Sequence, residues 1–197
     1  MRYSSEHKAE TRERVLKEAA KEIRAKGPDN VAVSGIMARV GLTHGGFYAH
    51  FASKDALVKE AIGTMFADAR KRTERIDANG DPRAVLRAYV DFYLSPAHRD
   101  SRDRGCPLPT LSGDFARSQP ATRTRFGEGV VGIASRLAAP LQALGHADAE
   151  AESRVLVAQL VGAVALARAV GDSELSDAML ADTHASIVVR YGLETVQ

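Results

Sequence analysis

Apolar residues recur every three to four positions along almost the whole chain, and this periodicity limits the folds open to it. Within residues 12–26 they mark one face of a helix, which Gly27-Pro28 ends. The positions in that segment are Val15, Leu16, Ala19, Ala20 and Ile23. Only Val31-Ala32-Val33 has β-forming character, and three residues without a partner strand do not build a sheet. We therefore expect an all-α fold of about nine helices.

The same periodicity and the helix-breaking residues predict where those helices lie. They fall at 12–26, 33–40, 44–51, from 53 to the break that begins at Asn79, and at 82–94, 106–118, 120–144, 148–170 and 173–192. Thr43 and Ser53 are the expected N-caps of the third and fourth helices. The charged segment 95–104 is expected to be a mobile loop. We place a domain boundary inside the fourth helix, which divides the chain into domains 1–54 and 55–197.

Composition narrows the class of protein. The chain has 197 residues, of which 45% are hydrophobic and 26% charged, as in globular domains. Cys106 is the only cysteine, so no intrachain disulfide or cysteine-rich zinc site is possible, which favours a reducing, cytoplasmic setting. The longest apolar stretch, 155–170, is too short to span a bilayer, so we expect no membrane partner. No cofactor or metal motif is present, and we expect neither.

The net charge of +2 hides an asymmetry between the two ends of the chain. Residues 1–75 carry 15 Lys and Arg against 10 Asp and Glu, whereas residues 76–197 carry 12 against 15. A basic front suggests contact with a polyanion, although a solvated charged face has the same composition.

Two short predicted helices, 33–40 and 44–51, are joined by a tight turn at Gly41. This is the pattern of a helix-turn-helix, whose second helix lies in the major groove of DNA with its first residues near base edges. An ordinary α-hairpin has the same spacing, so the spacing alone leaves both interpretations open.

The residues that open the second of these helices suit contact with bases. Thr43 and His44 offer a hydroxyl and an imidazole to base edges. Gly45 and Gly46 each cost about 1 kcal/mol of helix stability relative to alanine. Glycines at these positions also let the backbone come close to the duplex, which gives a reason for them other than stability.

Three residues further along suit contact with the DNA backbone. Tyr48 and His50 can hydrogen-bond phosphates, which positions a protein on DNA without reading sequence. Lys54, at the start of the next helix, adds a positive charge. Phe47 and Phe51, four residues apart, are expected in the core under either interpretation. Tyr48 and His50 could equally be a core cap and a solvated side chain.

The seventeen residues from Gly41 to Leu57, GLTHGGFYAHFASKDAL, resemble the signature of the TetR/AcrR family of transcriptional regulators. The upstream segment 11–16, TRERVL, is similar to the family's first helix, so the resemblance covers about residues 8–60. It implies an N-terminal three-helix DNA-binding domain and a larger C-terminal helical domain. The second domain would bind a small-molecule effector and form a homodimer through the last two helices.

The resemblance also implies a repressor that leaves its pseudo-palindromic, double-stranded operator when the effector binds. Ala32 stands where the family usually has a capping Thr that touches a phosphate, and Ser34 is a candidate to take part of that role. Gly46 stands where a small hydroxyl residue is common. The expected DNA-binding residues are Ser34, Thr43, His44, Gly45, Gly46, Tyr48, His50 and Lys54.

The second domain holds most of the aromatic residues that could line an effector cavity between helices. The candidates are Met65, Phe66, Tyr89, Phe92, Tyr93, Cys106, Leu111, Phe115 and Phe126. At helical spacing, the same residues could belong to an ordinary hydrophobic core. The basic run Arg70, Lys71 and Arg72 is expected near the C-terminal end of its helix, where the helix dipole favours cations.

Cys106 carries a sharper hypothesis. It follows Arg102 and Arg104 and begins a predicted helix, and both features lower the pKa of a thiol. A thiolate there would sense electrophiles or oxidants, as some members of the family do, and the alternative is a small buried hydrophobe. An enzyme that pairs His98 with Cys106, or a helical adaptor that binds only protein, are the remaining alternatives. No catalytic motif supports the enzyme.

Overall fold

The computed structural model describes residues 2–77 and 80–194, and every regular element in these ranges is helical. The elements are α1 (Arg2–Lys26), α2 (Val33–Arg39), η1 (His44–Ala49), α3 (Lys54–Asp77), α4 (Pro82–Tyr93), α5 (Pro96–Asp100), α6 (Leu108–Phe115), α7 (Pro120–Ala143), α8 (Ala149–Ala169) and α9 (Ser173–Arg190). The predicted all-α class is confirmed. The described part of the chain holds nine α-helices and one 3₁₀ helix, η1.

Local residue chemistry sets several of the helix ends. Gly27 has a φ of +79°, which ends α1 where the sequence predicts. The Ser53 hydroxyl accepts a hydrogen bond of 3.0 Å from the Ala56 amide, so the predicted cap of α3 is confirmed. Thr43 occupies the N-cap position of η1, but its side chain makes no capping hydrogen bond.

Two hydrophobic cores share α3. The N-terminal core joins α1, α2 and η1 to the first half of α3, and it also takes Leu111 and Phe115 from α6. The second core is built mainly from α4, α7, α8 and α9. Phe66 and Phe126 pack against both cores. Helix α3 runs unbroken from one core to the other, so the predicted boundary between residues 54 and 55 falls in the first turn of a helix that both cores share.

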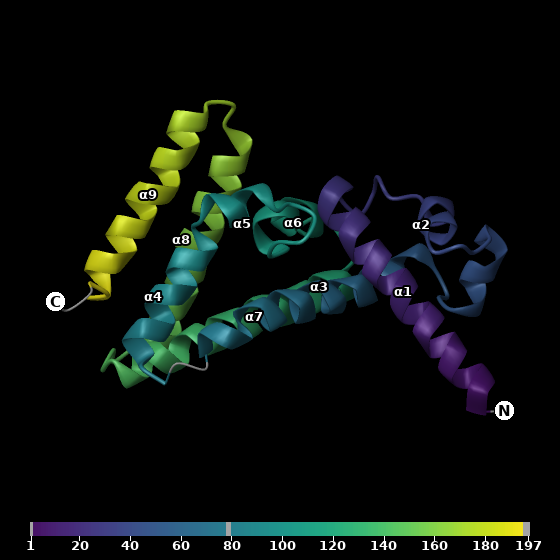
Figure 1. Cartoon of the computed structure of the whole chain (residues 1–197), viewed down its shortest axis with the longest axis horizontal. Helices are drawn as coiled ribbons and strands as arrows, with labels where there is room; N and C mark the ends of the chain where they lie inside the picture. Colours follow the sequence, from purple (N-terminus) through teal and green to yellow (C-terminus); the bar gives the residue numbers. More distant parts are fainter. Residues whose placement is uncertain (1, 78–79, 195–197) are drawn as a thin grey trace.

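Figure 1 shows the position of α3 between the two halves of the molecule. Helices α3 and α7 lie side by side along its length, with α1 and α2 at one end. At the other end α8 and α9 form an antiparallel pair, against which α4 and α7 pack. No helix among the described residues is long and apolar enough to cross a membrane.

Two local predictions are wrong. Segment 95–104 is not simply an extended mobile loop, because Ser95 caps α5 and His98 within it is only 4% exposed. The second helix of the helix-turn-helix is a 3₁₀ helix of six residues rather than an α-helix of eight. Gly45 and Gly46, which favour α-helix poorly, both lie inside it.

His98 joins three segments through both of its ring nitrogens. Its Nδ1 lies 2.7 Å from the Tyr93 carbonyl, and its Nε2 accepts a hydrogen bond of 3.2 Å from the Cys106 amide. A carbonyl can only accept, so Nδ1 carries the proton and the ring is neutral. The Arg168 guanidinium reinforces this region by donating to the backbone oxygens of His98 and Arg99 and to the Thr110 hydroxyl.

Burial of the ring gives the stability of this region a pH dependence. Desolvation lowers the pKa of His98 to about 4, against the Tyr93 hydrogen bond, which acts in the opposite direction. Between pH 6.5 and 4 the unfolded chain therefore binds a proton at His98 that the folded chain does not bind. Folding stability is unaffected by this group above pH 6.5 and falls as the pH drops through this window.

We expect wild type to lose about 2 to 3 kcal/mol more free energy of unfolding than H98Q between pH 7.5 and pH 4.5. The glutamine amide can donate to Tyr93 and accept from Cys106 without titrating. Urea denaturation of both proteins at the two pH values measures the difference. An equal loss in both proteins would contradict the neutral, buried state of His98.

Candidate nucleic-acid interface and ligand cavity

Helix η1 is held against the N-terminal core by two aromatic side chains. Phe47 and Phe51 are fully buried, and their rings stack with centroids 5.6 Å apart. The Arg12 guanidinium of α1 lies 4.7 Å above the Phe51 ring and binds Glu60 of α3 at 2.6 Å. These contacts fix η1 between α1 and α3, and both phenylalanines lie in the core as predicted.

The opposite side of η1 is open to solvent. Thr43, His44, Gly45 and Tyr48 are all exposed, and Tyr48 has 65% of its surface accessible. The Tyr48 ring meets the edges of His44 and Phe47, at centroid distances of 6.1 and 5.3 Å. A hydroxyl, an imidazole and a phenol therefore face outward together from one rigid element.

The two glycines of η1 are not required by packing inside the protein. A Cβ atom at Gly45 would meet nothing within 4 Å, and one at Gly46 would make ordinary contacts of 3.8 Å with Met37 and Thr43. Neither glycine has a positive φ. The protein itself would thus accept alanine at both positions, so packing inside the protein does not require glycine there.

The remaining predicted DNA-binding residues differ in how freely they are presented. Ser34 is exposed on α2. Lys54 donates a hydrogen bond of 3.0 Å to the Asp29 carbonyl, which leaves two of its three N–H groups for another partner. His50 is half-buried with an unpartnered Nδ1, and burial lowers its pKa, with Lys8 and Arg12 acting in the same direction.

Part of the positive charge at the front of the chain is already neutralised. Arg39 pairs with Glu22 at 2.8 Å, and Lys17 pairs with Glu13 at 2.7 Å. Arg14 donates to the Val40 carbonyl at 2.8 Å, next to the turn before η1. The basic front therefore positions the helix-turn-helix as well as leaving charge for a polyanion.

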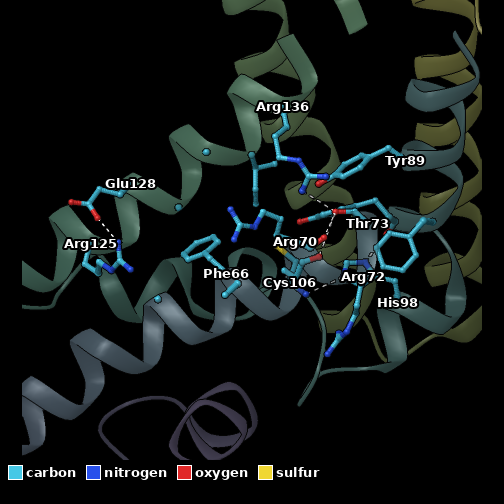
Figure 2. A pocket seen from close by; sticks show the side chains of 18 residues that line it. Phe66, Arg70, Arg72, Thr73, Tyr89, His98, Cys106, Arg125, Glu128 and Arg136 are labelled. Carbon is cyan, nitrogen blue, oxygen red and sulfur yellow. Dashed lines mark hydrogen bonds and ion pairs between the residues drawn. The ribbon is translucent and has the colours of Figure 1, made fainter. Parts of the chain in front are cut away.

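A cavity of about 440 Å³ lies in the second half of the molecule, between α3, α4 and α7 (Figure 2). Five of the nine predicted lining residues border it, namely Phe66, Tyr89, Phe92, Tyr93 and Cys106. The other four do not. Met65, Leu111 and Phe115 are fully buried in the N-terminal core, and Phe126 packs between the two cores, so the alternative of ordinary core packing holds for them.

Sequence reasoning missed most of the polar lining. The residues concerned are Arg70, Arg72, Thr73, His98, Arg125, Glu128 and Arg136. Their spacing contains a usable signal, because Phe66, Arg70 and Thr73 recur at i, i+4 and i+7 along α3 and so share a face. The sequence predicts that the basic run follows the helix dipole, and Arg70 and Arg72 also border the cavity.

Two glycines make room for the side chains of the cavity wall. A Cβ atom at Gly129 of α7 would lie 2.1 Å from the Phe66 ring, and one at Gly63 of α3 would lie 2.4 Å from the Arg125 guanidinium. Arg125 is held by Glu128 at 2.6 Å. The Phe66 ring thus packs directly on the backbone of α7.

Of the two interpretations of Cys106, its burial favours the small hydrophobe over an activated thiol. The side chain is buried, and desolvation raises its pKa in spite of nearby Tyr93, Arg168 and Arg24, which act in the opposite direction. The thiol is therefore mainly protonated near neutral pH, as expected of a small buried hydrophobe.

The geometry also argues against a His98–Cys106 catalytic pair. The His98 Nε2 atom accepts the backbone N–H of Cys106, so it is not available as a base for the thiol. Among residues 2–77 and 80–194, no group of three or more His, Cys, Asp or Glu side chains is arranged to hold a metal ion.

The sequence and the fold both match known regulators. Residues 15–61 match the family described as "Bacterial regulatory proteins, tetR family". The chain is 39% identical over 67 residues to YdgC, an HTH-type transcriptional regulator of Bacillus subtilis (strain 168), and 29% identical over 91 residues to YvdT of the same organism. These matches cover 34% of YdgC and 47% of YvdT, so the chain matches less than half the length of either relative.

Solved structures match over nearly the whole chain. Reduced Escherichia coli NemR has a TM-score of 0.78 at 20% identity, covering 90% of this chain and 95% of NemR. A TetR transcriptional regulator from Chloroflexus aurantiacus J-10-FL has a TM-score of 0.79 at 24% identity, covering 93% and 96%. At these identities the structures show a common fold. The relatives are transcriptional regulators and not enzymes. Residues 15–61 therefore resemble the N-terminal region of the TetR family of bacterial regulatory proteins, and the described chain has the fold of TetR-family regulators.

Proposed function

We propose that the chain is a cytoplasmic, homodimeric repressor that binds a pseudo-palindromic DNA operator and releases it when a small molecule fills the cavity. The observation that carries the proposal is the exposed face of η1, where Thr43, His44 and Tyr48 project from a helix anchored by buried phenylalanines. Rigid presentation matters because base recognition depends on hydrogen bonds of narrow geometry.

The two kinds of DNA contact divide along η1 and its neighbours. Thr43 and His44, at its start, are assigned to base edges, with Gly45 and Gly46 allowing the backbone close to the groove. Tyr48 and Ser34 are assigned to phosphates, together with the free N–H groups of Lys54. His50 is assigned a supporting phosphate contact, because its ring is half-buried.

A chain of aromatic contacts supports communication between the cavity and the DNA-binding half. Phe66 borders the cavity and lies 5.7 Å from Phe126, whose ring lies 4.9 Å from Phe115 in the N-terminal core. A ligand that displaces Phe66 would therefore disturb packing on the N-terminal side. Close-packed side chains pass such displacements on because few voids are left to absorb them.

The outer faces of α8 and α9 support a dimer. Val155 and Leu166 on α8, and Leu175 and Val189 on α9, are large apolar side chains exposed to solvent. Small residues lie on the outer face of α8 between the first two, at Ala158 and Gly162. Two such helix pairs related by a two-fold axis would form a four-helix interface and bring two copies of η1 to successive half-sites.

Selection of bound sequences from a pool of random duplexes at physiological salt tests the proposal. We expect an enriched palindrome whose half-sites lie about one helical turn or slightly more apart. Binding should weaken steeply with rising salt, because phosphate contacts release counterions. A helical adaptor would enrich no sequence and retain no DNA, and that result would refute the proposal.

Substitutions should separate base contacts from phosphate contacts. His44→Ala is expected to change which palindrome is enriched in the same selection. Tyr48→Phe is expected to weaken binding to every sequence by roughly tenfold, because it removes a hydrogen bond to a charged phosphate without base information. Titrations against the selected operator and against a scrambled duplex measure both effects. A Tyr48→Phe variant that weakened only the selected operator would contradict the phosphate assignment.

The dimer is tested by a matched pair of substitutions. Gly162→Arg on α8 and Gly113→Arg on α6 both add a side chain where a Cβ atom would meet nothing within 4 Å. We expect Gly162→Arg to give a monomer by sedimentation velocity and to weaken operator binding by at least a hundredfold, because one half-site is then lost. Gly113→Arg should remain dimeric. Two dimeric variants would contradict the assignment of the interface to α8.

A further inference from the structure

The charge of the cavity lining narrows the class of effector. Four arginines border the cavity, whereas the only acidic side chain on its described wall is Glu128. Glu128 is engaged by Arg125 at 2.6 Å, so it does not neutralise the others. The wall therefore carries an excess of positive charge next to apolar rings. This combination favours an anionic ligand with an apolar part over a neutral or cationic one.

Arg70 is the arginine best placed to hold an anion. Its guanidinium makes no hydrogen bond or ion pair within the described residues, whereas Arg136 donates to the Thr73 hydroxyl at 2.9 Å. Figure 2 shows the Arg70 side chain reaching into the cavity on the side of Phe66, while the Arg136 side chain from α7 reaches toward Thr73. A planar guanidinium matches a carboxylate through two parallel hydrogen bonds.

A second observation points independently to a bound molecule. The hydroxyl of Tyr93 is buried at the cavity wall with no oxygen or nitrogen partner, and it interacts only with groups as weak in hydrogen bonding as the Cys106 thiol; the residue is 2% exposed. Leaving a buried hydroxyl unpaired costs about 1 to 3 kcal/mol. Burial also raises the pKa of Tyr93 well above its ordinary value, so the group is a donor at neutral pH. It is available to donate to a polar atom of a ligand.

From these features we propose that the effector is a small carboxylate with an apolar body. The carboxylate binds Arg70, the body packs against Phe66 and Phe92, and the Tyr93 hydroxyl donates to a polar atom of the ligand. A carboxylate fits better than a neutral molecule, because it can form two parallel, charge-assisted hydrogen bonds with the guanidinium. This inference rests on the proposed function and names the chemical class of the molecule that releases DNA.

Pairs of acids and alcohols with the same body test the proposal on the full chain. Calorimetry compares 2-naphthoate with 2-naphthalenemethanol, and octanoate with 1-octanol. We expect at least one acid to bind at least tenfold more tightly than its alcohol. Arg70→Gln should weaken binding of that acid at least tenfold and change the affinity for the alcohol less than twofold. Lys71→Gln, which removes a neighbouring charge outside the cavity, should change neither.

Tyr93→Phe separates a ligand contact from a structural role. The variant removes a hydroxyl that has no oxygen or nitrogen partner, so its stability without ligand should equal or exceed that of wild type, while its affinity for the acid falls severalfold. The proposal is overturned if neither acid binds more tightly than its alcohol, or if Arg70→Gln and Lys71→Gln weaken the acid equally. Both results are read without DNA. If ligand-free wild type failed to bind its selected operator, the proposed function would be refuted instead, so the two failures are distinguishable.

Discussion

One helix, α3, belongs to both halves of the molecule, and the arrangement of the rest depends on it. Its first half supplies Leu57, Ile62 and Met65 to the core that supports η1. Its second half supplies Phe66, Arg70 and Thr73 to the cavity wall. Since backbone hydrogen bonds run unbroken through it, the DNA-binding half and the cavity are joined by a rigid element rather than by a flexible linker.

Local chemistry made most of the fold predictable. Periodicity located the helices, and Gly27 and Ser53 marked ends that the structure confirms. The errors arose where distant residues decide the outcome. His98 lies in a segment that reads as a charged loop, yet contacts with Tyr93 and Cys106 bury it. The sequence around His98 gives no indication that Tyr93 and Cys106 are its partners.

The two candidate sites also differ in how far they can be predicted from local sequence. The exposed residues of η1 follow one another in sequence, so a local motif was enough to nominate them. The cavity joins α3, α4 and α7, and its lining depends on which helices pack together. Four of the candidate aromatic residues, Phe66, Tyr89, Phe92 and Tyr93, border the cavity, whereas the apolar candidates Met65 and Phe115 lie in the core. At Cys106 the local sequence was misleading. Arginines nearby in sequence suggested a thiol with a lowered pKa, but burial raises the pKa of this thiol by more than the nearby charges lower it.

The length of α3 has a mechanical consequence. Sixteen residues separate Arg70 from Lys54, which at 1.5 Å per residue is a lever arm of about 24 Å. Tilting a rod of that length by about 5° moves its far end by about 2 Å, comparable to the difference between a hydrogen bond and no bond. An angular change too small to alter the hydrophobic contacts around the cavity is thus magnified at the end that carries η1. If a small molecule fills the cavity as proposed, a long stiff helix gives it a way to act on DNA at a distance.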